Sequence, residues 1–508
     1  MISPLKKKGF LFNSFIISFQ KLFAAVVGIG ITPIILQELG IEDYGLYTLM
    51  VGFVGALTFI NWSLSMTTQR YVAFALGEGI YENQLKAFSN AMLIHLLYAS
   101  AIFIVIVFLG GWAVDHFLEI PLARKEAANI LLYLVGGITV VSIISTPYLG
   151  VVKAHENFLF YAGLGITGTL FKIFIVIILK YFSCDSDKLI FYTILLLISA
   201  LLVFIINQWY TSRRFKEAVF YFHYVEKEVL KNMLGFMGWN IFGSLAVIGR
   251  NQGVSVLLNI FFGVIKNAAY GIATQVNFAL GILSQGITGA LTPRILKSAG
   301  SKNQKQMVND VVVMTKLSVI STAYLILFFL LEAEFILNLW LNRIPDSAII
   351  FTKYILLFSF TTSLSGGLQV VFNAIGKVKD YSIWISTIIL LNLPVGSLFF
   401  KLGYPPQTIF LVSIVLELIA LFVRVYLLKR FIDFNIADFL VQIFIKTLLP
   451  TVIIIITASF IPFDVVSNQY LKASLTLVYI LLFYSLLVYF ISFDKKERSL
   501  IIKIFVKK

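Results

Sequence analysis

The sequence has few charged residues, few histidines and almost no cysteine. Only 13% of its 508 residues are charged, four are histidine, and the single cysteine is Cys184. A soluble domain carries roughly 25% charged residues, so a chain this apolar is not a set of soluble domains. One cysteine excludes an internal disulfide. The sequence also shows no His/Cys metal cluster and no phosphate-cradling glycine-rich loop, so it predicts no metal and no cofactor.

Long apolar runs fill most of the chain. Hydrophobic residues make up 59% of it, and the mean hydropathy is +0.93. Each run exceeds the ~20 residues that a helix needs to cross a bilayer, and a helix satisfies its own backbone hydrogen bonds in lipid. The sequence therefore predicts an all-α polytopic membrane protein with about fourteen transmembrane helices. These lie near 11–37, 44–68, 88–113, 128–150, 157–182, 189–210, 234–262, 270–292, 308–334, 347–375, 381–402, 407–428, 439–462 and 471–493.

Basic residues are distributed unevenly between the two sides of this predicted arrangement. With both termini in the cytoplasm, the inner segments hold 26 of the Lys and Arg residues and the outer loops hold 8. This asymmetry follows the positive-inside rule, so we predict that both termini are cytoplasmic. Basic residues facing an anionic leaflet also account for the net charge of +15, and no nucleic-acid partner is predicted.

One short motif occurs twice. EDYGLYT at 42–48 has a counterpart in AAYGIAT at 268–274, and TQR at 68–70 has a counterpart in TPR at 292–294. Each copy covers six predicted spans, an even number, so both copies insert in the same orientation. We therefore predict two six-helix lobes related by a pseudo-two-fold axis along the membrane normal, with a central cleft between them.

The predicted organisation has four parts. They are an N-terminal six-helix lobe (1–215), a cytoplasmic amphipathic linker (216–233), a C-terminal six-helix lobe (234–432), and two extra transmembrane helices with a basic cytoplasmic tail (433–508). Two equivalent bundles can rock about their interface and expose the cleft to each side of the membrane in turn. The repeat therefore predicts alternating access.

The whole chain resembles a known group of transporters. The stretches LGIEDYGLYTL (39–49) and GVIKNAAYGIATQVNFALGILSQGITGALTPRILK (263–297) look like the polysaccharide transporters of the multidrug/oligosaccharidyl-lipid/polysaccharide exporter superfamily, and most of all the O-antigen flippases (Wzx type). The resemblance implies a flippase that moves an undecaprenyl-pyrophosphate-linked oligosaccharide from the inner to the outer leaflet of the bacterial plasma membrane, for surface polysaccharide export. We also expect contact with membrane lipids, association with polysaccharide polymerase machinery, and function as a monomer.

Charged residues inside apolar spans are candidates for substrate binding, because a charge at mid-bilayer costs roughly 3 kcal/mol on insertion scales. Lys21 lies in the first span and Arg250 in the first span of the second lobe. The register of the Tyr-Gly motif would place Lys21 against Val247, one helical turn from Arg250. A guanidinium binds phosphate bidentately and an ammonium is a mobile point charge. We predict that both bind the pyrophosphate in the cleft; the alternative is a structural or snorkelling role.

Four further cations extend the predicted site. Arg70 and Arg294 end the TQR and TPR motifs at cytoplasmic helix ends, where each would either capture phosphate at the entrance or anchor its helix. Lys172 and Lys316 lie within spans and are predicted to line the cavity.

Glu417 is the acid that the predicted spans place at mid-membrane, and Arg424 follows it two helical turns later on the same face. The spacing predicts either an ion-coupling site or a structural ion pair.

Two other functions remain open. Multidrug exporters of the same superfamily commonly use a buried acid, and the first helix here has none from Asn13 to Gln37. A polysaccharide polymerase or ligase is the alternative among enzymes, but the large outer loop expected for it is missing. We therefore predict a transporter and not an enzyme.

Overall fold

The structure, a computed structural model, describes residues 4–57, 60–116, 120–181, 187–341, 344–433, 435–461, 468–494 and 497–498. Within these ranges the chain forms helices and no strand, which confirms the all-α class. Cys184, singled out in the sequence, lies outside the described residues.

The chain divides into two compact units. The N-terminal lobe comprises Phe15–Gly238 and Gly300–Lys302. The C-terminal lobe comprises Met1–Ser14, Trp239–Ala299 and Asn303–Lys508. Two helical lobes are therefore present as predicted, and the symmetry axis between them stays a prediction.

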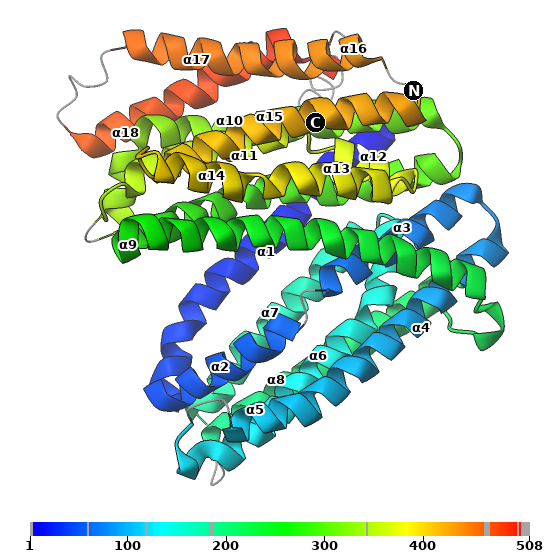
Figure 1. The fold of residues 1–508 in the computed structure, drawn as a ribbon. Helices are drawn as coiled ribbons and strands as arrows, with labels where there is room; N and C mark the ends of the chain where they lie inside the picture. The colour runs from blue at the N-terminus through cyan, green and yellow to red at the C-terminus, as the bar shows by residue number, and fades with distance from the viewer. Residues whose placement is uncertain are drawn as a thin grey trace. The chain divides into compact units, whose positions relative to one another are not determined.

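The N-terminal lobe is a helical bundle with α6 in its interior (Figure 1). α6 packs along α8, α4 and α3, and its Leu131 and Leu132 are fully buried in a cluster with Met50 and Ile106. Burial of such apolar side chains against one another holds the bundle together. The helices of the lobe are α1 (Pro4–Leu39) from Phe15 onward, α2 (Ile41–Leu57), α3 (Asn61–Glu78), α4 (Tyr81–Val105), α5 (Gly111–His116), α6 (Lys125–Ala154), α7 (Phe158–Tyr181) and α8 (Lys188–Arg214).

The C-terminal lobe repeats this plan and adds a final pair of spans. Its α9 (Lys227–Gly300) consists of two helices that meet at Gly263. The other helices are α10 (Gln304–Trp340), α11 (Ala348–Ser363), α12 (Leu368–Ala374), α13 (Val378–Leu390), α14 (Asn392–Lys401) and α15 (Thr408–Phe431). The final pair consists of α16 (Ile436–Leu440), η4 (Val441–Leu448), α17 (Leu449–Phe460), α18 (Gln469–Tyr479), η6 (Ile480–Tyr484), α19 (Ser485–Leu487) and η7 (Val488–Ser492), and it packs on α10 through a cluster that includes Ile320, Leu327 and Tyr484.

The helix boundaries show that the sequence repeat is a repeat of structure. Counterpart helices begin at Tyr81 and Gln304, at Lys125 and Ala348, at Phe158 and Val378, and at Lys188 and Thr408. Gly40 and Gly263 have positive φ (83° and 79°), and each follows the first helix of its lobe. The two glycines and the first two helix pairs are separated by the same number of residues. This separation is slightly smaller than the one between the two Tyr-Gly motifs.

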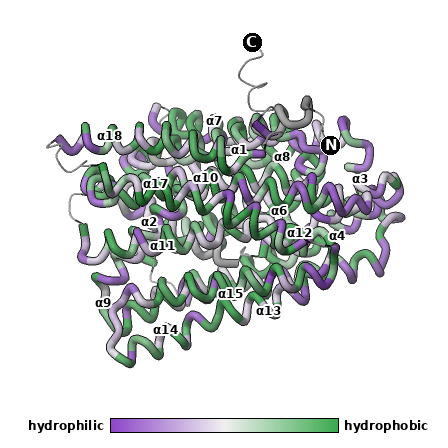
Figure 2. Tube along the Cα trace, turned by 90° about the horizontal axis from the view of Figure 1, so that it is seen from above, coloured by the Kyte–Doolittle hydropathy of each residue, from purple (hydrophilic) through white to green (hydrophobic). Residues whose placement is uncertain are grey.

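All fourteen predicted spans fall on helices, but fewer qualify as membrane spans by themselves. In the described part of the chain, eleven helices are long and apolar enough to cross a membrane, and α11 with α12, bent by 43°, makes a twelfth. The two remaining predictions, 44–68 and 270–292, are counterparts in the repeat. In the described residues the first is shared between α2 and α3, and the second lies in the later half of α9. Figure 2 shows that hydropathy differs between the helices, since α3 is largely hydrophilic whereas α15 is hydrophobic along most of its length.

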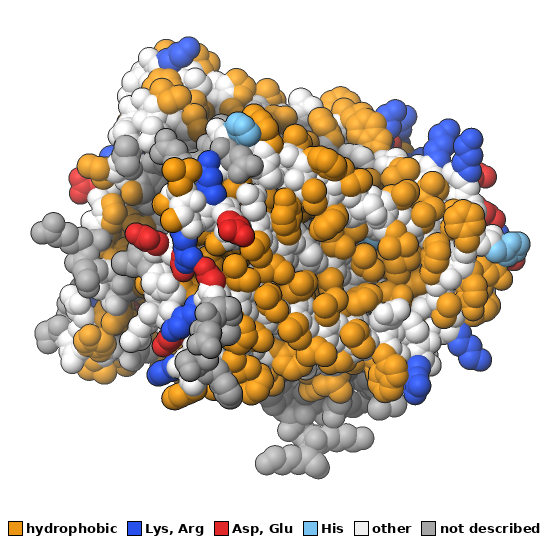
Figure 3. Space-filling model, turned by 90° about the horizontal axis from the view of Figure 1, so that it is seen from below, with side chains coloured by type: hydrophobic (Ala, Val, Ile, Leu, Met, Phe, Trp, Pro, Cys, Tyr) orange, Lys and Arg blue, Asp and Glu red, His pale blue; other side chains and the backbone are white. Residues whose placement is uncertain are grey.

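The surface and the loop contacts agree with a membrane-spanning bundle. Hydrophobic side chains cover the middle of the face in Figure 3, and charged side chains gather at its edges. In the N-terminal lobe, Arg124 bonds to Asp43 (Nε to Oδ1, 2.9 Å) and to Asp187, which joins three segments predicted to lie outside. Lys86 binds Glu226 at 2.8 Å, which joins two segments predicted to lie inside. The alternating order of these loops is therefore consistent with the predicted spans.

Candidate functional site: a cavity around Arg250

The two halves of α9 fold back on each other and hold polar side chains between them. Ser255 Oγ donates a hydrogen bond to Asn267 Oδ1 at 2.7 Å, and Tyr270 OH donates to the Asn251 carbonyl at 3.3 Å. These contacts bring together residues on either side of Gly263, whose left-handed backbone permits the reversal. A polar side chain in an apolar helix needs a partner, and each half supplies partners for the other.

This hairpin forms one wall of a cavity of about 580 Å³ within the C-terminal lobe, which we call the Arg250 cavity. Its other wall comes from α11 and α15. Among the described residues that line it, none is Asp or Glu. The lining consists of Arg250, the amides Asn251, Gln252, Asn267 and Asn277, the hydroxyls Ser255, Tyr270, Thr274 and Ser413, the aromatic residues Phe278, Phe358 and Phe410, and Val254, Gly271 and Ile355.

Arg250 is held in the cavity by neutral groups. Its Nε and Nη2 donate to Asn251 Oδ1 at 3.2 and 3.0 Å, and its guanidinium carbon lies 4.8 Å from the centre of the Phe358 ring. Within the described residues, no carboxylate lies within ion-pair distance of it. A cation fixed by an amide and an aromatic face keeps its full charge, so the cavity suits an anion.

The rest of the cavity offers hydrogen bonds and flat apolar contacts. Tyr270 stacks on Phe410 with ring centres 5.9 Å apart. Among the residues that the structure describes, the buried Asn277 Oδ1 has no hydrogen-bond donor. A buried amide oxygen without a donor is costly, so a ligand hydroxyl or N–H at this point would be stabilised. The described ranges contain no cluster of His, Cys, Asp and Glu that would hold a metal ion.

Glu417 and Arg424 form a buried network beside the cavity. Arg424 Nη1 donates to Glu417 Oε1 at 2.5 Å and to Ser365 Oγ at 3.0 Å, and its Nε donates to Tyr381 OH at 3.4 Å. Ser365 Oγ also lies 3.3 Å from Glu417 Oε1. The two residues predicted as a pair from their spacing thus contact each other, at the break between α11 and α12. Whether they also couple an ion stays a prediction.

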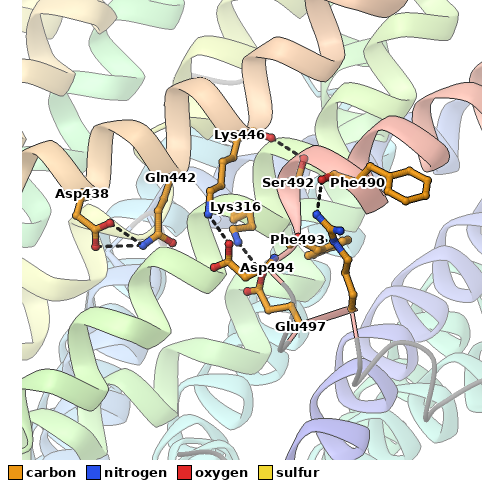
Figure 4. Close-up of polar contacts among 10 residues, drawn as sticks. Lys316, Asp438, Gln442, Lys446, Phe490, Ser492, Phe493, Asp494 and Glu497 are labelled. Atoms are coloured by element: carbon orange, nitrogen blue, oxygen red, sulfur yellow. Dashed lines mark hydrogen bonds and ion pairs between the residues drawn. The ribbon is translucent and has the colours of Figure 1, made fainter.

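Lys316, predicted to line the cavity, lies fully buried in α10 and contacts Glu497, which follows the last helix (Figure 4). Its Nζ is 2.9 Å from Glu497 Oε2. A parallel contact joins Lys446 Nζ and Asp494 Oδ1 at 2.5 Å. The hydrogen bond from Lys446 holds the pKa of the Asp494 carboxyl below its ordinary value. These two ion pairs attach the segment after the last helix to the C-terminal lobe.

The repeat-related arginines have different surroundings. Arg70 packs its guanidinium against Tyr71 and Phe236, 4.6 and 4.7 Å from the ring centres. Arg294 Nε instead pairs with the buried Asp310 at 2.9 Å. Each contact fixes its arginine within its own lobe, and a role for either at the substrate entrance stays a prediction.

Lys21 and Lys172 lie on the N-terminal lobe, half-buried on α1 and exposed on α7 respectively. Lys21 lies about five helical turns before Gly40, whereas Arg250 lies less than four turns before Gly263. At the rise of an α-helix the two cations therefore differ by about 9 Å in their distance from these glycines, each measured along its own helix. Measured from Gly40 and Gly263, the separation is larger than the one turn that the Tyr-Gly motif gives, and whether the two cations lie at one depth in the membrane stays a prediction.

The sequence interpretation did not identify the uncharged polar side chains that line the cavity. Asn251 and Gln252 follow Arg250 directly, Ser255 lies little more than one helical turn later, and Asn267 and Asn277 lie on the other half of α9. Clusters of amides within an apolar run were the available signal, because each would be costly in lipid without a partner.

Part of the sequence and the fold as a whole resemble known proteins. Residues 240–398 match the family model MatE. No curated protein matches the sequence. Solved structures do match: MATE in the bent conformation has a TM-score of 0.70, with 14% identity over 82% of this chain and 93% of that chain. The chain has the MATE fold.

Two other MATE-fold structures match about equally well, and both cover 82% of this chain and 94% of their own at 14% identity. One is a multidrug resistance MATE family transporter of the MOP superfamily in its outward-facing conformation, with a TM-score of 0.68. The other is a MOP superfamily transporter from Pyrococcus furiosus Vc1, described by the reverse polarity of its binding pocket, with a TM-score of 0.69. The MATE fold is that of multi-pass membrane proteins, in agreement with the predicted spans. The narrower resemblance to O-antigen flippases is not confirmed.

Proposed function

We propose that the protein is a membrane transporter that exports an amphiphilic organic anion, with the Arg250 cavity as part of its substrate path. The observation that carries this proposal is the fixed positive charge of Arg250 beside amides, hydroxyls and aromatic rings, in a lining whose described residues include no acid. Such a lining accepts a phosphate, sulfate or carboxylate next to an apolar or hydroxylated body. Two lobes with the same helix plan support alternating access as the mechanism.

The comparisons favour an exporter of small molecules over the lipid-linked sugar flippase that the sequence resembles. One of the matching structures is a multidrug resistance transporter, and none of the three above is described as a flippase. The charge of the Arg250 cavity argues against cationic drugs, because a cation next to Arg250 would be repelled and its own charge left unpaired. An exporter of anions reconciles the fold with the cavity.

A flippase for an undecaprenyl-pyrophosphate-linked oligosaccharide is the second candidate. Arg250 is what favours it, since a guanidinium binds phosphate oxygens bidentately. With a negative cell interior, moving two negative charges outward is favourable by roughly 4–5 kcal/mol per 100 mV, so the potential assists export of either anion. Both candidates assume a bacterial plasma membrane, cytoplasmic termini and function as a monomer.

Transport into or out of proteoliposomes distinguishes these functions. We would compare carboxyfluorescein as a small organic anion, ethidium as a cation, and a fluorescent citronellyl-pyrophosphate-linked sugar as a flippase substrate. The proposal expects carboxyfluorescein transport above that of empty liposomes and little ethidium transport. Movement of the pyrophosphate-linked sugar alone would establish the second candidate. Preferential ethidium transport would contradict both.

A further inference from the structure

The charge of the Arg250 cavity depends on the partner that fixes Arg250. Asn251 Oδ1 accepts hydrogen bonds from two nitrogens of the guanidinium, at 3.2 and 3.0 Å. An aspartate would present a similar oxygen at this position and would form the same contacts. It would, however, cancel the charge of Arg250, as carboxylates do in bidentate pairs with arginine. The amide therefore orients Arg250 without neutralising it.

One acid, Glu417, lies close to the cavity, and its negative charge is already compensated by an ion pair. Ser413 lines the cavity, and Glu417 lies one helical turn further along α15. Arg250 is within electrostatic reach of Glu417 and also of Arg424. Because Arg424 binds the Glu417 carboxylate at 2.5 Å in a buried site, that carboxylate is neutralised locally rather than by Arg250.

We infer that Asn251 and Arg424 are specificity-determining residues that keep the cavity positive, so that it selects anions over cations of the same shape; this rests on the proposed substrate path through the Arg250 cavity. Asn251 acts by being a neutral acceptor. Arg424 acts by forming an ion pair with the Glu417 carboxylate. An aspartate in place of Asn251, or an uncharged residue in place of Arg424, leaves the cavity with an added negative charge that offsets Arg250. The preference between ions of opposite charge then shifts toward the cation.

The test uses two probes that share a phenyl ring and differ in charge, phenyl phosphate and phenyltrimethylammonium. Binding to the full-length protein in nanodiscs of zwitterionic lipid is measured by calorimetry. We expect the wild type to bind phenyl phosphate more tightly. Asn251→Asp should weaken phenyl phosphate by about 10-fold or more and strengthen phenyltrimethylammonium. Asn251→Ala, which loosens Arg250 but adds no charge, should weaken phenyl phosphate less and should not strengthen the cation.

The same chemical change at Asn435 provides a matched control. Asn435 caps α16 outside the cavity, and aspartate caps a helix equally well, so Asn435→Asp should leave the binding of both probes at wild-type values. Arg424→Gln exposes Glu417 and should also weaken phenyl phosphate. Adding Glu417→Gln to it removes the new charge and should restore most of the lost affinity, a recovery that purely structural damage would not show.

The outcomes separate the inference from the proposed function. If the wild type binds neither probe, the proposed substrate path through the Arg250 cavity is wrong. If the wild type binds phenyl phosphate and Asn251→Asp binds both probes as the wild type does, the path stands and the inference about Asn251 is overturned. If the double variant at 417 and 424 binds phenyl phosphate as weakly as Arg424→Gln, the compensating role of Arg424 is overturned.

Discussion

The two lobes share one plan of helices and differ most clearly in one of them. In the N-terminal lobe α6 runs unbroken from Lys125 to Ala154, even across Pro147. Its counterpart in the C-terminal lobe is divided into α11 and α12, bent by 43° at residues 364–367. The same fold therefore tolerates both a straight and a broken helix at this position.

The broken helix coincides with buried charge. At the break, the Gly367 N–H donates to Thr315 Oγ1 at 3.1 Å, so a backbone group released by the bend finds a partner on α10. Ser365 contacts both members of the Glu417–Arg424 pair. When Lys188 of α8 is aligned with Thr408 of α15, Leu197 and Phe204 take the places of this pair in the N-terminal lobe. The comparison indicates that the repeat keeps the helix plan, while at this position only the C-terminal lobe carries an ion pair.

The largest expected effect comes from breaking this pair. Glu417→Ala leaves the Arg424 guanidinium buried without its carboxylate, and should lower the free energy of unfolding by about 3–5 kcal/mol. Replacing both residues by their N-terminal counterparts, as Glu417→Leu with Arg424→Phe, should be far milder, because an apolar pair needs no compensation. Thermal unfolding in detergent measures both. If the double variant is as unstable as Glu417→Ala, the two lobes are not interchangeable at this position.

An intermediate effect is expected at the repeat-related arginines. Arg294→Ala removes an ion pair to the buried Asp310 and should cost about 1.5–3 kcal/mol. Arg70→Ala removes contacts with aromatic rings and should cost about 0.5–2 kcal/mol. The two variants can be ranked by their unfolding temperatures, with Arg294→Lys as the control that keeps a positive charge. Equal decreases in unfolding temperature would show that the two arginines stabilise the fold equally despite their different partners.

A small effect is expected at the two glycines of positive φ, and it should be the same in both lobes. Alanine at Gly40 or Gly263 meets no atom within 4 Å, so only the positive φ opposes it, at about 1–2 kcal/mol. Gly45→Ala is the matched control, since it lies in the open within α2 and has an ordinary helical backbone; it should be neutral or slightly stabilising. Unfolding temperatures that differ strongly between Gly40→Ala and Gly263→Ala would contradict the equivalence of the two hairpins.

The fold was predictable because its main signal is local. Each span is an apolar run of sufficient length, and such a run in lipid must form a helix whatever surrounds it. The break at 364–367 was not recognised, although Gly366 and Gly367 within the run 347–375 were a signal for it. The second span of each lobe does not qualify by itself for different reasons: α2 has 17 described residues and is short, whereas the later half of α9 carries amides such as Asn277 and Gln285 within its apolar run.

The site was less predictable because it depends on contacts between distant residues. Depth in a span identified both Arg250, as a binding residue, and Lys316, as a cavity-lining residue. The structure separates them: Arg250 lies in a cavity beside an amide, whereas Lys316 is paired with Glu497 near the end of the chain. Nothing in the local sequence of either residue distinguishes a charge that is available to a ligand from one that is already neutralised.

The central claim is that the charge of Arg250 serves transport, and Arg250→Ala in proteoliposomes tests it most directly. The rate is measured for the anion that the wild type carries, carboxyfluorescein or the pyrophosphate-linked sugar, with thermal unfolding as the control for folding. We predict a rate lower by about 10-fold or more at an unchanged unfolding temperature, and a clear loss also for Arg250→Lys, which cannot reproduce the bidentate contact. A well-folded Arg250→Ala protein that carries the anion at the wild-type rate would contradict the account.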